Sequence, residues 1–188
     1  MGTLLLTSLY NSTYQSGDGV GLFVGFFILL IFSARISGSH FNPAVTLAFM
    51  LRKDTGRFSR KLGICYIVFQ YAGGLLGGLI SYNLFKANGT QPLSLVPQQE
   101  CNNSGCDTYY LYIQAIVMEI IGSMLLVFLY LTQTEEKTKL SEGDPAITTL
   151  IIAASYFAVI FYADSVDTLT SSPFNPASSL GLFWAILF

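Results

Sequence analysis

The sequence predicts an all-α membrane protein with an inverted internal repeat, in which transmembrane helices surround two re-entrant half-helices that meet at the midplane. Three observations lead to this fold class. Only 11% of the 188 residues are charged, less than half of the roughly 25% found in soluble domains. Four apolar stretches come close to the roughly 20 residues that a membrane-spanning helix needs. Two shorter apolar stretches each begin with Phe-Asn-Pro-Ala and occupy matching places in the repeat.

The composition argues against several other classes of protein. Hydrophobic residues make up 52% of the chain, more than a soluble globule of this size can bury. Nine Lys and Arg against 11 Asp and Glu give a net charge of −2, so no basic surface for nucleic acid is expected. Three Cys and one His are too few for a structural metal cluster. No nucleophile–base set is evident, and we expect no metal, no cofactor and no enzymatic activity.

The four predicted spans cover residues 20–36, 62–85, 110–131 and 146–163. The shorter stretches, 41–51 and 174–188, cannot cross a bilayer and are expected to be re-entrant or buried. Residues 1–10 are also apolar but make half a span at most. They lack the basic start and the cleavage site of a signal peptide.

Basic residues orient the spans. Five lie between residues 52 and 61 and two between 132 and 145, so these loops are expected to face the cytoplasm. The loops 10–19 and 86–109 then face outside. All three N-glycosylation acceptor patterns fall in these outer loops, at Asn11, Asn88 and Asn102. They favour the plasma membrane or another membrane of the secretory pathway. In the second outer loop, Cys101 and Cys106 either form a disulfide or remain free thiols.

The two halves of the chain resemble each other. "IGSMLLVFLY" at 121–130 matches "MGTLLLTSLY" at 1–10, and "SSPFNPASSLGL" at 171–182 matches "SGSHFNPAVTLA" at 37–48. We assign a single channel domain to residues 1–188, with repeats over about 1–86 and about 110–188. With three crossings in each unit the copies lie inverted in the membrane, an arrangement typical of transport proteins.

Each short stretch begins like a capped helix, with Asn at the N-cap and Pro at the first helical position. The two starts are Asn42-Pro43-Ala44 and Asn175-Pro176-Ala177. One such motif is usually an ordinary capped helix, but inversion brings these two N-termini together at membrane depth, where irregular backbone must be buried or line a water-filled cavity. Their partial positive charge repels cations, and the two amides orient a passing water so that proton transfer is interrupted. The pair therefore predicts a pore for neutral molecules.

These residues identify a family resemblance. "SGSHFNPAVTLA" at 37–48 is similar to the first loop motif of the aquaporins, the major intrinsic protein family, and the resemblance covers essentially the whole chain. It implies six spans, two half-helices, a pore in each protomer and a homotetramer in the lipid bilayer. Glu119 resembles the buried glutamate of the family's fourth helix, which braces the re-entrant loop. The implied function is passive conduction of water, with glycerol or other small uncharged solutes as further candidates. The alternative is a non-conducting structural or assembly subunit.

The second motif departs from the family pattern. Ser178 stands where the family has Arg, so we expect a constriction that is wider or more neutral and lacks one barrier to cations. Counting from the Asn-Pro-Ala motifs places the other pore positions at Leu22 or Phe23, near Tyr156, and at Ser172. His40, which also belongs to the pore region, is expected to hydrogen-bond the loop backbone.

The family pattern is also incomplete at both ends. Residues 1–10 correspond to the latter half of a first span, without its bracing glutamate, and the sequence stops within the second half-helix. Unsatisfied carbonyls at membrane depth cost several kcal/mol each. We therefore expect the sequence to be a portion of a longer protein; the alternative is that another subunit supplies the missing walls.

Overall fold

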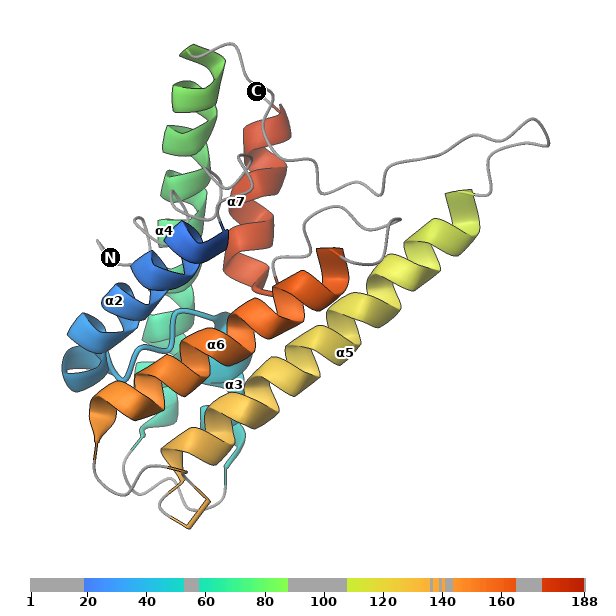
Figure 1. Cartoon of the computed structure of the whole chain (residues 1–188). Helices are drawn as coiled ribbons and strands as arrows, with labels where there is room; N and C mark the ends of the chain where they lie inside the picture. Colours follow the sequence, from blue (N-terminus) through green and yellow to red (C-terminus); the bar gives the residue numbers. More distant parts are fainter. Residues whose placement is uncertain are drawn as a thin grey trace.

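The computed structural model describes residues 19–52, 58–87, 108–135, 137–138, 140, 144–164 and 174–187. Within these ranges all regular secondary structure is helical, which confirms the predicted class. The helices, drawn in Figure 1, are α2 (Gly19–Ser37), α3 (Pro43–Leu51), α4 (Arg60–Ala87), α5 (Thr108–Thr134), α6 (Pro145–Asp164) and α7 (Pro176–Leu187). Each predicted span and each short stretch forms a helix close to its expected bounds.

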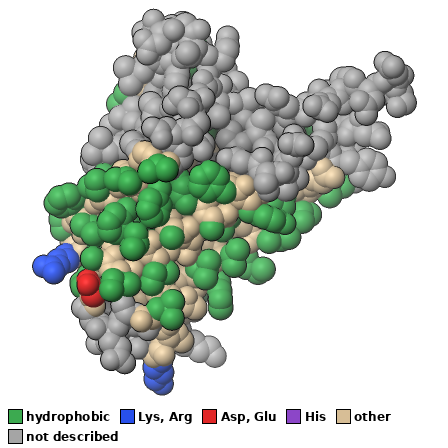
Figure 2. Space-filling view, viewed as in Figure 1, with side chains coloured by type: hydrophobic (Ala, Val, Ile, Leu, Met, Phe, Trp, Pro, Cys, Tyr) green, Lys and Arg blue, Asp and Glu red, His purple; other side chains and the backbone are tan. Residues whose placement is uncertain are grey.

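Three helices in the described part are long and apolar enough to cross a membrane, over Arg60–Ile80, Tyr112–Thr134 and Pro145–Tyr162. The apolar part of α2, Phe23–Ser37, is shorter. Large apolar side chains remain exposed on these helices; on α5, Ile116, Ile120 and Phe128 are 58–61% exposed. Figure 2 shows hydrophobic side chains over most of the described part of one face. Such a surface needs a cover of lipid or protein.

Three helices begin with the same type of N-cap. Asn42, Asp144 and Asn175 each precede a Pro, and the side-chain oxygen of each accepts the backbone N–H two residues further on, at 2.9, 2.8 and 3.1 Å. The Pro has no N–H to leave unpaired at the first helical position. The same local sequence, Asn or Asp followed by Pro, thus begins α3, α6 and α7.

Helices α4 and α7 make the most extensive contact between elements of the described part. Glycine makes this contact possible, because a Cβ at Gly74 would overlap the carbonyl oxygen of Ala177 and a Cβ at Gly78 would overlap that of Gly181. The two backbones therefore touch. As Figure 1 shows, α7 runs from the middle of the molecule toward the end where α4 finishes.

The apolar core lies between α2, α5 and α6, and α3 begins beside it. The rings of Phe26 and Tyr156 stack with centroids 4.8 Å apart, and Phe157 meets Phe23 edge-on at 5.5 Å. Leu30, Val45 and Ala153 are 0–2% exposed. This packing surrounds the start of α3 with rigid side chains and so positions the site described next.

Candidate functional site

Asn42 and Asn175 each form a hydrogen bond to the loop that precedes the other residue. The Nδ2 of Asn42 donates a hydrogen bond to the carbonyl of Phe174 at 2.7 Å, and the Nδ2 of Asn175 donates to the carbonyl of Phe41 at 3.0 Å. All four residues are buried. Because each carbonyl belongs to the residue just before the opposite Asn, α3 and α7 meet cap to cap.

The similarity between the two repeats extends into the first turn of each half-helix. Thr46 and Ser179 each donate their backbone N–H to the carbonyl of the cap four residues earlier, at 3.0 Å in both copies. Their hydroxyls donate to the same carbonyls, at 3.2 Å from Thr46 and 3.1 Å from Ser179. The sequence repeat thus corresponds to a repeat in bonding geometry, and no cap carbonyl is left unpaired.

The backbone before the second cap is unusual. Phe174 has a φ of +44°, in the left-handed region that a bulky residue seldom adopts. Its ring is fully buried and packs against Gly122 of α5, where a Cβ would overlap the ring. Because Gly122 has no side chain, the ring of Phe174 fits against α5. This packing fixes the position of the Phe174 carbonyl, which accepts the hydrogen bond from Asn42.

The loop before the first cap is braced from α4 and α5. Gly38 and Ser39 both have left-handed backbone, with φ of +74° and +59°, which turns the chain sharply toward the cap. The hydroxyl of Tyr130 donates to the Gly38 carbonyl at 2.5 Å. The Nε2 of Gln70 donates to the carbonyl of His40 at 2.6 Å. Both braces are buried, so these two carbonyls of the irregular loop are paired away from water.

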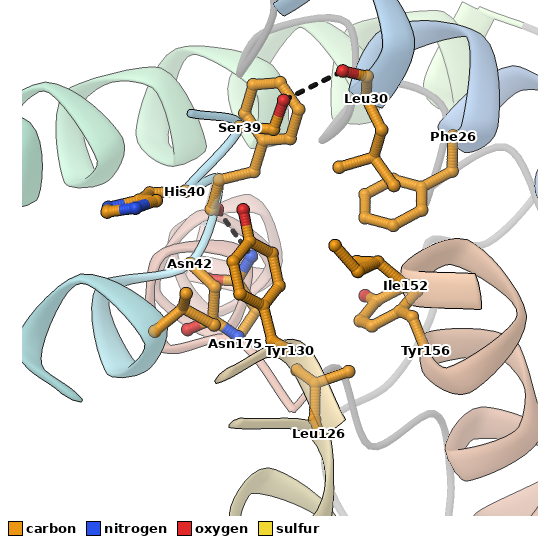
Figure 3. A pocket seen from close by; sticks show the side chains of 12 residues that line it. Phe26, Leu30, Ser39, His40, Asn42, Leu126, Tyr130, Ile152, Tyr156 and Asn175 are labelled. Carbon is orange, nitrogen blue, oxygen red and sulfur yellow. Dashed lines mark hydrogen bonds between the residues drawn. The ribbon is translucent and has the colours of Figure 1, made fainter. Parts of the chain in front are cut away.

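A cavity of about 30 Å³ lies beside the two amides. In Figure 3, side chains of α2 and α6 face Asn42, Asn175 and Tyr130 across it. Three helices contribute two lining residues each, Phe26 and Leu30 from α2, Leu126 and Tyr130 from α5, and Ile152 and Tyr156 from α6, and α3 contributes Val45. Such a volume accommodates about one or two waters.

A wider cavity of about 300 Å³ adjoins the first one. The same three helices continue into its wall one turn further along, with Ala34 from α2, Thr134 from α5 and Thr149 from α6. An ion pair between Arg52 and Glu135 joins the ends of α3 and α5. The wider cavity therefore lies on the side of the narrow one toward the loops predicted to face the cytoplasm.

The structure brings together several residues that the sequence placed at the pore. Asn42, Asn175, Tyr156 and His40 all contribute to the lining of the narrow cavity. Pro43 and Ala44 open α3, and Pro176 and Ala177 open α7.

Other expected pore residues lie elsewhere. Phe23 does not line the narrow cavity; its ring packs on Phe27 and Phe157 within the core. Ser178 is buried in the first turn of α7, also outside that lining. Glu119, which was expected to brace the re-entrant loop and not to line the pore, is half-buried on α5. Leu22 belongs to α2, but its side chain is outside the described part. Also outside the described residues are Ser172, Asn11, Asn88, Asn102, Cys101 and Cys106.

The expected hydrogen bond from the His40 side chain to the loop backbone is not present at Nδ1. This atom is buried and has no hydrogen-bond partner in the described part of the chain. The ring instead lies among four aromatic rings, with centroids 4.2–6.1 Å away: Phe49, Phe58, Tyr66 and Tyr130. These rings come from α3, from the segment before α4, from α4 and from α5.

Two bracing residues were not identified from the sequence. Gln70 is an amide near the middle of α4, with apolar residues on both sides, and a polar group inside a span is expected to have a role. The same argument that singled out Glu119 applies to it. Tyr130 carried no comparable signal, because a Tyr near the end of a span is common at membrane interfaces.

Two half-helices that meet cap to cap beside a narrow cavity, within a bundle of membrane-length helices, define a channel-type membrane protein. The family model described as Major intrinsic protein matches residues 3–185. The chain therefore belongs to the major intrinsic protein family of membrane channels and is a multi-pass integral membrane protein, as the sequence motifs indicated.

Individual relatives agree with this assignment. The chain is 31% identical over 159 residues to the probable aquaporin PIP2-6 of Oryza sativa subsp. japonica, covering 82% of this chain and 51% of that one. It is 30% identical to aquaporin PIP1-1 of Arabidopsis thaliana, covering 82% and 50%. It is 26% identical to aquaporin-5 of Ovis aries, covering 78% and 49%. The chain thus spans about half the length of the curated relatives it matches.

A solved structure matches the fold. The aquaglyceroporin of Plasmodium falciparum superposes with a TM-score of 0.63 at 19% sequence identity, over 98% of this chain and 76% of that one. This likeness confirms the predicted architecture of transmembrane and re-entrant helices.

Proposed function

We propose that this protein forms a passive channel for water that excludes protons, with glycerol or other small uncharged solutes as further candidates. The observation that carries the proposal is the reciprocal bonding of Asn42 and Asn175. A side-chain amide has two N–H donors, and each of these bonds uses one of them. Both Asn side chains line the cavity, where the second donor of each serves to orient a water oxygen.

Electrostatics support the exclusion of cations. The N-termini of α3 and α7 meet at the cavity, and each helix N-terminus carries a partial positive charge of roughly half an elementary charge. Among the described residues that line the narrow cavity there is no Asp, Glu, Lys or Arg. A cation at this point faces two positive helix ends without a compensating carboxylate, whereas a neutral water with its oxygen toward the amides is stabilised.

A non-conducting structural subunit is the second candidate. The observation that favours it is the small volume of the cavity, about 30 Å³, between Tyr130 and Tyr156. We further propose that one channel domain forms each protomer of a homotetramer, in which lipid and neighbouring protomers cover the exposed apolar faces. The acceptor patterns in the predicted outer loops support a plasma membrane or other secretory-pathway location.

The test is water flux through the full-length protein reconstituted in lipid vesicles. Stopped-flow osmotic shrinkage is expected to be faster than in empty vesicles, and Asn175→Ala should slow it. Asn83 provides a matched control, because its amide is exposed and bonds only within α4 in the described part of the chain. Shrinkage at the rate of empty lipid, with the protein folded and inserted, would contradict water conduction and favour the second candidate.

A further inference from the structure

Tyr130 stands at the junction of the two cavities. It lines both the narrow cavity beside the amides and the wider one beyond it, as do Leu30, Ser39 and Ile152. Any solute that moves between the Asn pair and the wider cavity passes these four side chains. Tyr130 is the largest of them, and Figure 3 shows its ring beside Asn42 and Asn175.

The ring of Tyr130 is held in place on several sides. It is 5% exposed, and its hydroxyl donates to the carbonyl of Gly38 at 2.5 Å. It meets the rings of His40 and Phe49 edge-on, with centroids 6.1 and 5.9 Å away. The left-handed backbone at Gly38 turns this carbonyl toward α5. Rotation of the phenol out of the passage would break the tether and disturb two ring contacts.

The sizes of the cavities show where the passage narrows. On the far side of Tyr130 the volume is about 300 Å³, and on the side of the amides it is about 30 Å³. The narrow volume holds about one or two waters, and glycerol has several times the volume of one water. The narrowing occurs where the phenol projects between the helices.

We propose that Tyr130 determines which solutes pass, by restricting the pore on the cytoplasmic side of the Asn pair to a single file of water and excluding polyols such as glycerol. This inference rests on the proposed channel function and specifies its substrate class. The ring supplies the restriction, and its packing against His40 and Phe49 holds it in place even without the hydroxyl tether.

The experiment compares water and glycerol permeability of the full-length protein in vesicles for the wild type, Tyr130→Ala, Tyr130→Leu and Tyr130→Phe. Tyr112→Ala is the matched control, because Tyr112 lies exposed on the same helix. We expect the wild type and the control to pass water but not glycerol. Glycerol permeability should rise severalfold in Tyr130→Ala and in Tyr130→Leu, which retains more of the packing, and should stay low in Tyr130→Phe.

The outcomes separate this inference from the proposed function. Water flux in the wild type with unchanged glycerol flux in both smaller variants would overturn the role of Tyr130 and leave the channel function standing. Glycerol flux in the wild type as high as in Tyr130→Ala and Tyr130→Leu would also overturn the role of Tyr130 and leave the channel function standing. A wild type that passes nothing, with flux appearing in Tyr130→Ala or Tyr130→Leu, would support Tyr130 as the barrier and contradict an open channel. No flux in any form would overturn both.

Discussion

The side-chain amide of Asn42 donates a hydrogen bond to the backbone carbonyl of Phe174, 2.7 Å away and 132 residues later in the chain. The same Asn caps α3, because its side-chain oxygen accepts the N–H of Ala44 at 2.9 Å. One side chain therefore starts a helix and joins two repeats. Asn175 does the same for α7 and Phe41, so the site depends on both residues together.

This reciprocity predicts that substitutions at the two caps are strongly coupled. Asn42→Ala removes a helix cap and leaves the buried carbonyl of Phe174 without its donor, at a cost of about 2 kcal/mol or more. Asn175→Ala should cost a similar amount. The double variant should cost less than the sum, since each single change already loosens the other loop, with a coupling of about 0.5–3 kcal/mol.

Denaturant unfolding in detergent micelles measures these free energies. Asn83→Ala serves as the control, because a change on an exposed helix face costs no more than about 0.5 kcal/mol. Strict additivity of the two cap substitutions would show that the loops do not support each other.

The glycines of α4 are predicted to differ sharply in their tolerance of Ala. At Gly74 a Cβ would overlap the backbone carbonyl of Ala177, which cannot move without displacing α7. Gly74→Ala should therefore destabilise the protein by about 1–3 kcal/mol. At Gly63 a Cβ would instead overlap the Sδ and Cγ of the flexible Met50 side chain, with the Phe58 ring 3.1 Å away and no backbone atom among its nearest neighbours. That side chain can rotate, and Ala gains about 0.5–1 kcal/mol of helix propensity over Gly, so Gly63→Ala should be close to neutral.

Thermal unfolding of the two Ala variants, together with the monodisperse fraction on size exclusion, distinguishes these cases. Equal behaviour of Gly74→Ala and Gly63→Ala would be inconsistent with the close contact between α4 and α7.

Gln70 is predicted to stabilise the first re-entrant loop. Its Nε2 donates to the His40 carbonyl at 2.6 Å and lies 2.8 Å from the Thr46 hydroxyl. Gln70→Leu leaves both buried groups without this donor and should cost about 1–3 kcal/mol, with reduced water flux because the loop beside the cavity is loosened. Thr46→Val leaves the Gln70–His40 bond intact and should have the smaller effect on both measurements. The reverse order would show that Thr46, rather than Gln70, holds the loop.

Ser178 is predicted to influence which solutes the channel conducts. In Ser178→Arg, a cationic guanidinium replaces a short hydroxyl near the start of α7 and should narrow the path and reduce glycerol flux. The change is best measured in the Tyr130→Ala background, where we expect glycerol to pass. Ser178→Met, of comparable bulk but uncharged, separates the effect of charge from that of size. Glycerol flux that Arg leaves unaltered would place position 178 away from the conduction path.

Much of the fold could be predicted because its signals are local. Apolar length indicated the four spans, and Asn before Pro marked the starts of α3 and α7. The rotation of each helix about its own axis was harder to predict. A membrane helix is apolar on the side facing lipid and on the side facing the core, so its periodicity does not show which face is buried. Phe23 and Tyr156 were both candidates for the pore, yet of the two only Tyr156 lines the narrow cavity, whereas Phe23 packs on Phe157.

By itself, the amino-acid order determined that two capped half-helices exist and that they are related by a repeat, because caps, prolines and apolar runs act over a few residues. Only the tertiary structure decided that Gln70 and Tyr130 brace the first loop and that Gly74 admits the backbone of α7. These contacts join residues from separate helices. They depend on how neighbouring helices are rotated and how closely they approach, and side-chain packing sets both.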